Sequence, residues 1–221
     1  MIERSTYSEQ TVVYIKNKIL RGELKSGDRI KESDLAEELK ISRAPIREAL
    51  LTLTQEGLIE SKTRISRVIV SLTSKQIMDS YIVGGVLEGF AVAQSIHKFS
   101  ADDFEQLEKI VEKMRKYAEA PKKLAELSRL DHAFHDAMFV HVDNQLLVDF
   151  SLRSYRGAVQ FLLCRKWRET FTPESIYERH AALLDILKEG DPVTVERAIR
   201  AHYNDTGDVM SQFGSDRLGT E

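Results

Sequence analysis

The chain has 221 residues, of which 42% are hydrophobic and 30% are charged, and its formal net charge is -3. This balance excludes a disordered protein and suits one or two folded domains with a sizeable core. No stretch approaches the ~20 apolar residues of a membrane span, and the N-terminus lacks the apolar segment of a signal peptide, so we expect a cytoplasmic protein with no membrane partner. A single cysteine, Cys164, excludes an internal disulfide framework and a multi-cysteine zinc site.

The character of the sequence changes near residues 62–75, where KTRISRVIVSLTSK interrupts the helical patterns with a β-branched run. Residues 1–72 carry a net charge of +2 and the remainder carries -5, so the first part is mildly basic although the whole chain is acidic. We therefore predict two domains, residues 1–72 and residues 73–221, with a mainly α fold class.

The predicted elements follow the periodicity of apolar residues along the chain. The first domain is expected to hold three helices, at about 10–21, 33–40 and 42–56, with Ser33 capping the second. The second domain is expected to be all helical, with six amphipathic helices at about 75–97, 101–119, 122–140, 144–166, 173–189 and 192–213.

The second and third predicted helices almost touch in sequence, since SDLAEELK and SRAPIREALLTLTQEG are separated only by Ile41. Their apolar residues are spaced to share a core, as in a helix-turn-helix. Ser42 can cap the third helix, and Arg43 and Arg47 lie on its outward face, where a recognition helix meets base edges and phosphates. Segments 58–60 and 67–70 can form a two-stranded wing. The alternative is a small helical domain with solvated arginines.

Residues 8–72 strongly resemble the winged-helix domain of the GntR family of bacterial transcription regulators, which read "I..G.L.PG..L.E..LA..L.VSR.PVREAL..L..EGL". Two departures are Ser26 in place of the usual proline and Ser66 in place of the usual wing glycine, which permits backbone angles that serine resists. The resemblance implies double-stranded operator DNA as a partner. It places these residues on DNA: Ser33, Ser42, Arg43, Arg47, and, from the wing, Arg64 or Arg67.

The stretch LSRLDHAFHDAM, residues 127–138, has an apolar face that also carries Asp131 and His135. Later helices place His180 and His202 on their apolar faces as well. A lone inward histidine is usually a satisfied core residue, and an unpaired buried carboxylate is costly. Because one Asp and three His on three helices point inward together, metal binding is the better explanation.

The same four residues resemble the metal ligands of the all-helical FCD ligand-binding domain that GntR regulators of the FadR subfamily carry. The resemblance implies a divalent metal, and the donors suit zinc, nickel, manganese or iron. It also implies a pocket for a small-molecule effector, often an organic acid, held by an arginine in an R-x-x-L-E pattern. Here Gly84 replaces that arginine and leaves extra room, which argues against a simple carboxylate effector. The alternatives are a bulkier or less charged ligand, a ligand held by Arg153, Arg156 or the metal alone, or a glycine that only eases helix packing. The prediction of six helices after the wing, rather than seven, favours the VanR-like branch of these FCD domains.

Three functions compete on these grounds. The leading hypothesis is a metabolite-responsive transcription regulator, a homodimeric repressor rather than an enzyme, that binds a palindromic operator. The second is a metal-dependent hydrolase, since a metal with an open coordination position can activate water. The third is a helical interaction module whose polar cluster is structural.

Overall fold

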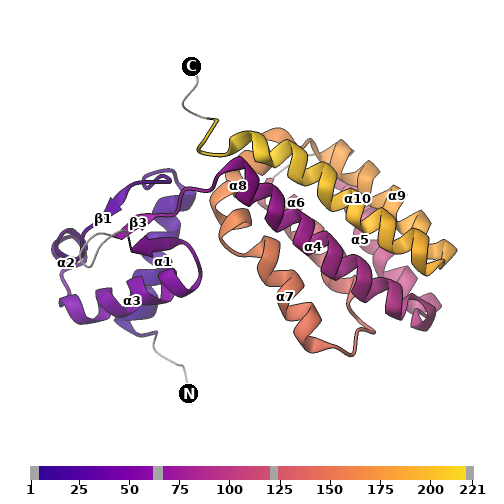
Figure 1. Cartoon of the computed structure of the whole chain (residues 1–221), viewed down its shortest axis with the longest axis horizontal. Helices are drawn as coiled ribbons and strands as arrows, with labels where there is room; N and C mark the ends of the chain where they lie inside the picture. Colours follow the sequence, from indigo (N-terminus) through magenta and orange to yellow (C-terminus); the bar gives the residue numbers. More distant parts are fainter. Residues whose placement is uncertain (1–4, 62–66, 120–123, 218–221) are drawn as a thin grey trace.

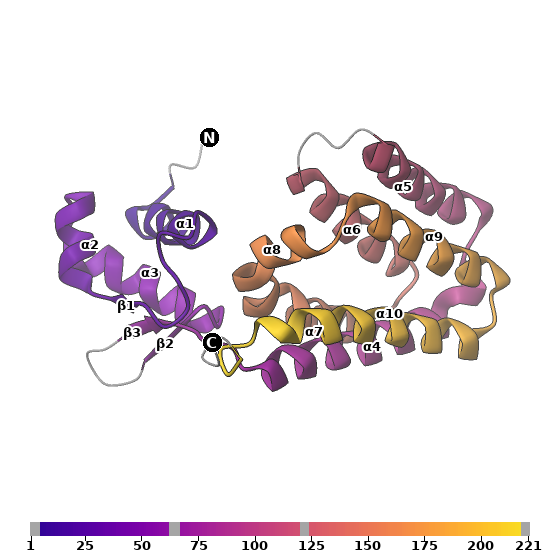
Figure 2. The same cartoon turned by 90° about the horizontal axis from the view of Figure 1, so that it is seen from above.

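The computed structural model describes residues 5–61, 67–119 and 124–217. Figures 1 and 2 show a small N-terminal part, with helices and a short sheet, beside one end of a larger bundle of helices. None of the helices in the described residues is both long enough and apolar enough to cross a membrane.

The N-terminal part has the element order of a winged helix. Its elements, in chain order, are α1 (Tyr7–Leu20), β1 (Arg29–Ile30), α2 (Glu32–Leu39), α3 (Arg43–Gln55), β2 (Ile59–Ser61) and β3 (Arg67–Ile69). The strands form an antiparallel sheet in the order β1-β3-β2, with Glu60 opposite Val68. The predicted wing strands are therefore confirmed, whereas β1 was not predicted. Arg64 and Ser66 lie outside the described residues.

The prediction that the second and third helices share a core is confirmed for Leu35, Ile46, Leu50 and Leu53, whereas Leu39 lies outside this core. Its buried apolar residues come from all three helices and from the sheet: Ile15, Ile30, Leu35, Ile46, Leu50, Leu53, Leu58, Ile59 and Ile69. Gly57 ends α3 in the left-handed conformation, with φ +73°, which glycine adopts without steric cost. The recognition helix is thus fixed on a packed base by its inner face.

The prediction that Ser33 caps α2 is wrong. The helix begins one residue earlier, at Glu32, and Lys31 is its N-cap, while the Ser33 hydroxyl donates to Asp34 at 2.9 Å. The physical reason is tertiary. β1 pairs with β3 up to Ile30, so the chain is extended until Lys31 and turns into the helix directly afterwards.

In the described residues the bundle has seven α-helices rather than the predicted six. They are α4 (Ser74–Ser95), α5 (Ala101–Glu119), α6 (Leu124–Met138), α7 (Gln145–Arg156), α8 (Ala158–Thr170), α9 (Pro173–Glu189) and α10 (Pro192–Met210). Short 3-10 turns follow α4, at Ile96–Lys98, and α10, at Ser211–Phe213.

The extra helix comes from a break at Gly157 inside the predicted helix 144–166. The backbone there has φ -76° and ψ -134°, which is not helical, and a Cβ at Gly157 would lie 2.9 Å from the Arg153 carbonyl oxygen. The apolar period runs on through the break, so periodicity alone could not reveal it. The helix count that favoured the VanR-like branch is therefore wrong.

The helices before and after this break pack against different elements. α7 packs along α4, whereas α8 packs against α1 of the N-terminal part as well as against α7 and α10. Three residues of α8, Ala158, Phe161 and Leu162, pack against the core of the N-terminal part, while Val159 and Leu163 lie in the core of the bundle. α8 therefore joins the two cores.

The longest helix contact in the bundle is between α4 and α10, which run side by side in Figures 1 and 2. Glycines allow this close approach, since a Cβ at Gly85 would lie 2.7 Å from Tyr203 Cβ and one at Gly207 would lie 2.9 Å from Tyr81 Cβ. The close packing against α4 positions α10 so that His202 points toward α6 and α9.

Candidate metal centre and DNA-binding surface

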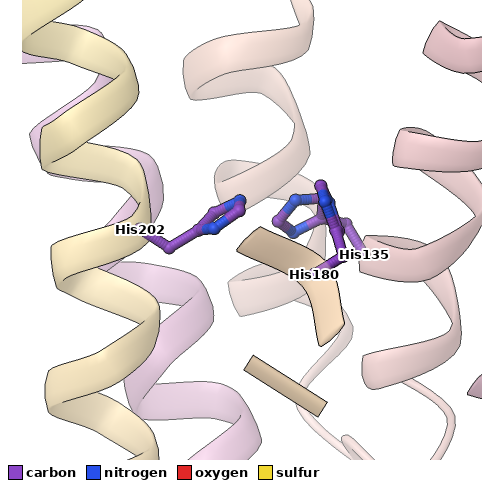
Figure 3. Close-up of side chains that lie close together, drawn as sticks. All are labelled: His135, His180 and His202. Atoms are coloured by element: carbon purple, nitrogen blue, oxygen red, sulfur yellow. The ribbon is translucent and has the colours of Figure 1, made fainter. Parts of the chain in front are cut away.

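Three buried or partly buried histidines meet inside the bundle, one from each of α6, α9 and α10. They are His135, His180 and His202, and Figure 3 shows their rings turned toward one another. Their ring centroids are 5.0–5.7 Å apart, and one nitrogen of each ring lies within 4.8 Å of the others. The prediction that these residues gather at one point inside the bundle is confirmed.

Hydrogen bonds orient two of the rings. Nδ1 of His135 donates to the Glu88 carboxylate at 2.6 Å, and Nδ1 of His180 donates to the Ile176 carbonyl oxygen at 2.7 Å. In each neutral ring, Nε2 is then the unprotonated nitrogen, and this is the arrangement that metal-ligating histidines adopt. Burial, and then the charges of His180 and His135, lower the pKa of His202 well below its usual value, so the His202 ring is neutral and able to donate a lone pair.

Asp131 lies beside the three rings, one helical turn before His135. Its Oδ1 is 3.3 Å from His180 Nε2, and its side chain is 14% exposed. Burial acts to raise the pKa of Asp131, but the nearby His180 imidazole and the charges of the histidines outweigh it and lower the pKa, so the carboxyl is ionised. When His180 is neutral, two acceptors face each other here, and the buried Nε2 has no hydrogen-bond partner among the described residues.

This donor set fits a divalent metal. A cation between Asp131 and His180 would satisfy both acceptors, and three imidazoles with a carboxylate suit zinc, nickel, manganese or iron. The fit rests on the unpartnered Nε2 and on the chemistry of the donors. The alternative is a proton shared between the Asp131 carboxylate and His180 Nε2. Measuring the metal content of the protein distinguishes a bound metal from a shared proton.

A second layer of residues supports the histidines, and sequence reasoning missed it. Glu88 of α4 is fully buried; it accepts from His135 on one oxygen and from the Tyr203 hydroxyl at 2.8 Å on the other. The signal was present, because a lone carboxylate stands in the apolar stretch GGVLEGF and demands a partner as Asp131 does. Glu88 fixes the orientation of the His135 ring.

A small cavity lies next to the histidines, lined by Tyr81, Asp131, His135, Gln160, Trp167, Ile176, Arg179, His180, His202, Tyr203 and Thr206. It measures about 430 Å³ out to its mouth, but the centre of a water molecule can reach only about 30 Å³ of it. That is room for about one or two waters. An organic ligand therefore needs side chains of the wall to move.

The three predicted effector residues lie elsewhere. Gly84 is buried in α4 and is not among the described residues that line this cavity. Arg153 and Arg156 line a separate groove between the N-terminal part and the bundle, together with Lys16, Gln55 and Phe161. Arg156 is engaged there, since it pairs with Asp136 at 2.6 Å and donates to the His132 carbonyl oxygen at 3.0 Å.

The predicted DNA-reading residues lie on the outside of the N-terminal part. Ser42 is the N-cap of α3, as predicted, and its hydroxyl makes no capping hydrogen bond. Arg43 and Arg47 are exposed on the first turns of α3. Glu32 was not predicted; it pairs with Arg47 at 3.1 Å and with Arg67 at 2.7 Å, so it links the recognition helix to the wing strand β3.

Two family models match the chain and together span nearly all of the described fold. Residues 7–69 match the model "Bacterial regulatory proteins, gntR family", and residues 79–205 match the model "FCD domain". The chain belongs to the GntR family, with an FCD domain. It is a transcriptional regulator with an effector-binding domain, and this pair of domains implies binding to operator DNA and to a small molecule.

Similar proteins agree with this membership. The GntR regulator is 29% identical over 198 residues to the HTH-type transcriptional regulator YdhC of Bacillus subtilis, covering 86% of this chain and 84% of YdhC. It is 27% identical over 212 residues to the gluconate operon transcriptional repressor of Bacillus licheniformis, covering 92% and 85%. In fold it resembles E. coli McbR/YncC, with a TM-score of 0.68 at 20% identity over 95% of this chain and 99% of that chain.

Two further histidines of this GntR regulator, His132 in α6 and His141 in the turn after it, provide a test of the ligand set. His132 contacts the Gln160 side chain, and His141 bonds to Asp103 at 2.8 Å. We expect His132→Ala and His141→Ala to keep metal content near that of the wild type, because neither ring belongs to the cluster of three. Elemental analysis of the purified variants checks this. Loss of metal from either variant would show that the proposed ligand set is wrong.

Proposed function

We propose that this regulator is a repressor that binds a two-fold operator as a homodimer and holds a divalent metal through Asp131, His135, His180 and His202. The observation that carries the proposal is a cluster of three histidines, inside a helical bundle that is joined to a winged helix. The printed names of two relatives support the repressor role: the gluconate operon repressor and a probable D-xylose utilization operon repressor of Paenarthrobacter nicotinovorans, which is 25% identical. We place the domain boundary between residues 72 and 73.

On DNA, we propose that Arg43 reads a guanine and that Ser42 binds a phosphate. An arginine can donate to both guanine acceptors in the major groove, and the Ser42 hydroxyl makes no capping bond that would compete with a phosphate. Arg47 and Arg67 would contact DNA from positions held by Glu32. The exposed Ser33 of α2 and the wing residue Arg64 complete the proposed set.

In the bundle, the residues of the chain would prepare the site before an effector arrives. Glu88 and Ile176 fix the tautomers of His135 and His180, so their Nε2 atoms face the metal position. A divalent metal held there would supply a Lewis-acid position next to the cavity. Arg153, Arg156 and the space near Gly84 stay as proposed effector contacts, the first two for a ligand in the groove between the domains.

Helix α8 offers a route between the cavity and the DNA-binding domain. Its residues Gln160 and Trp167 line the cavity, whereas Phe161 and Leu162 pack against the core of the N-terminal part. A ligand that displaces the first pair would shift the second pair, because all four stand on one rigid helix. The expected coupling is ~1–3 kcal/mol, typical of allosteric regulators.

A gel-shift assay with the DNA upstream of its own gene, combined with elemental analysis of the protein, tests the proposed function. Specific DNA binding together with about one metal per chain supports a metal-containing regulator. Metal without DNA binding would favour the hydrolase hypothesis. If the protein holds no metal and binds no DNA, a helical interaction module with a structural polar cluster would be favoured.

The homodimer is proposed to form through α4 and α7, which pack together and which both carry exposed apolar side chains. These exposed residues are Ile82, Val83, Val86 and Phe90 of α4, and Leu146 and Phe150 of α7. An apolar patch that spans two helices marks an interaction surface, and a second copy fits best because a two-fold operator needs a two-fold protein.

We expect Phe90→Glu to convert the dimer into a monomer, since it places a charge at the centre of this face. Operator affinity should fall with it, because one chain then meets only one half-site. Light scattering after size exclusion gives the mass. Val193→Glu is the matched control, since Val193 is 75% exposed on α10, outside this face, and this variant should stay dimeric. A Phe90→Glu protein that remains a dimer would place the interface elsewhere.

A further inference from the structure

The residues that follow α10 lie against the connection between the N-terminal part and the bundle. This connection is short, because β3 ends at Ile69 and α4 begins at Ser74. The 3-10 turn Ser211–Phe213 follows α10, and the end of α10 lies next to the start of α4 in Figures 1 and 2. We call the next three residues, 214–216, the C-terminal strap.

Three hydrogen bonds hold the strap on the connection. The Ser215 N–H donates to the Leu72 carbonyl oxygen at 2.8 Å. The Asp216 carboxylate accepts from the backbone N–H and from the hydroxyl of Ser74, at 2.6 and 2.9 Å. The dipole of α4 favours a negative charge at this first turn. Gly214 permits the close approach, since a Cβ there would lie 2.5 Å from the Ser74 hydroxyl oxygen.

The connection is also held at its other end, by the sheet of the N-terminal part. The Val70 N–H donates to the Leu58 carbonyl oxygen at 3.0 Å, which continues the pairing of β2 with β3. Between Val70, held by the sheet, and Leu72, held by the strap, stands only Ser71. Few backbone dihedral angles are left to vary, so these attachments set the direction in which the N-terminal part leaves α4.

The contact with α8 is a second support for the same orientation, and it is of a different kind. Ala158, Phe161 and Leu162 of α8 pack against the core of the N-terminal part through apolar side chains. Apolar contact has no preferred direction, whereas a hydrogen bond weakens steeply when its angle changes. The strap therefore fixes an angle that packing on α8 alone leaves free to rock.

We propose that the C-terminal strap determines which spacing of operator half-sites the regulator accepts; this rests on the proposed homodimer. In that dimer α4 lies at the interface, so the angle between α4 and the N-terminal part sets the separation of the two recognition helices. Each added base pair moves the far half-site by ~3.4 Å and turns it by ~35°. A fixed angle rejects such an operator, whereas a rocking N-terminal part accepts it.

The test compares operators that differ only in half-site separation. The operator is selected from random double-stranded DNA with the wild type, and versions with one base pair added or removed are measured by fluorescence anisotropy. We expect the wild type to bind these versions roughly 100-fold more weakly, the low end of what a second linked contact contributes. Asp216→Ala and Gly214→Ala should lose only about tenfold or less, because the strap is released.

The two variants release the strap by different routes, one by removing the acceptor and one by a steric clash at Ser74. Asp208→Ala is the matched control: it removes an exposed carboxylate of α10 outside the strap and should keep the spacing preference of the wild type. Circular dichroism and light scattering should show folded dimers throughout. If one strap variant does not fold, the other carries the test.

A distance measurement without DNA separates the strap from the proposed function. Spin labels at Val13→Cys of α1 and Val193→Cys of α10, which are 57% and 75% exposed, report the distance between the N-terminal part and the bundle. The background is Cys164→Ser, and excess unlabelled protein leaves one labelled chain per dimer. We expect a narrow distance distribution in the wild type and a broader one in Asp216→Ala.

The proposal is overturned if either the distance distribution or the spacing preference of Asp216→Ala equals that of the wild type. A wild type that is monomeric, or that selects no operator, would refute the proposed function and with it the spacing role. That outcome is recognised by a strap that still narrows the distance distribution, so the two failures are distinguishable.

Discussion

Replacing His180 with alanine is expected to empty the metal site and to lower the melting temperature of the bundle by ~5–10 °C. The physical reason is linkage: a metal present at about 100 times its dissociation constant stabilises the folded state by ~2.7 kcal/mol. Each kcal/mol corresponds to ~2–4 °C for a chain of this size. His180 is 1% exposed, and its loss would leave Asp131 facing the cavity without its partner.

A chelator separates the loss of metal from the loss of packing. The wild type should melt at a lower temperature after chelation and recover when metal is restored, whereas His180→Ala should respond to neither treatment. His141→Ala is the matched control and should respond as the wild type does, since His141 is tied to Asp103 outside the cluster. Full metal occupancy in His180→Ala, measured by elemental analysis, would contradict the proposed ligand set.

The DNA affinity of His180→Ala should largely survive in the absence of effector. The N-terminal part has its own core, and the three histidines lie in helices α6, α9 and α10 of the bundle. Its response to an effector should be lost, because the cavity is built around the same residue. A variant that binds DNA but no longer responds would show that sensing and DNA binding are separable functions of the two domains.

Arg43→Ala is expected to abolish specific binding to the operator. One arginine that pairs with guanine discriminates by ~1–3 kcal/mol, so two half-sites in a homodimer would lose ~2–6 kcal/mol. Arg47→Ala should weaken binding as well, because Arg47 extends from the same exposed face and pairs with Glu32. Metal content and melting temperature should stay unchanged, since both side chains lie outside the core.

Fluorescence anisotropy at fixed salt gives the affinity for the operator and for unrelated DNA. Arg129→Ala is the matched control: it removes one positive charge from an arginine that is 77% exposed on α6, remote from α3 in the sequence, and should leave operator affinity unchanged. An equal loss in all three variants would indicate a general effect of net charge. Unchanged affinity in Arg43→Ala would show that another residue reads the operator.

Local patterns in the sequence correctly predicted most helices and their buried faces. Leu127, Leu130, Phe134 and Met138 are all buried, as the period of the stretch 127–138 predicts. The same period placed Asp131 and His135 on the inner face of α6. These features depend on residues three or four apart in one helix, so neighbouring residues carry the information.

The sequence predicted less well where one helix ends and the next element begins. The break at Gly157 lies within a continuous apolar period, and it forms because α7 packs along α4 while α8 also reaches α1. The start of α2 was missed for a similar reason, since pairing of β1 with β3 decides where the chain leaves the extended conformation. Both features depend on contacts between segments that are far apart in the sequence.

At the histidine cluster, too, some features could be predicted from the sequence and others depend on tertiary packing. Sequence reasoning found the three histidines, because an imidazole on an apolar face is a local anomaly. Their meeting within 4.8 Å depends on the packing of α6, α9 and α10, and the role of Glu88 depends on the packing that brings His135 next to it. Sequence by itself determined which side chains point inward, because helix periodicity is local. Only the tertiary structure decided which of them meet, because distances between helices are set by side-chain packing across the whole bundle.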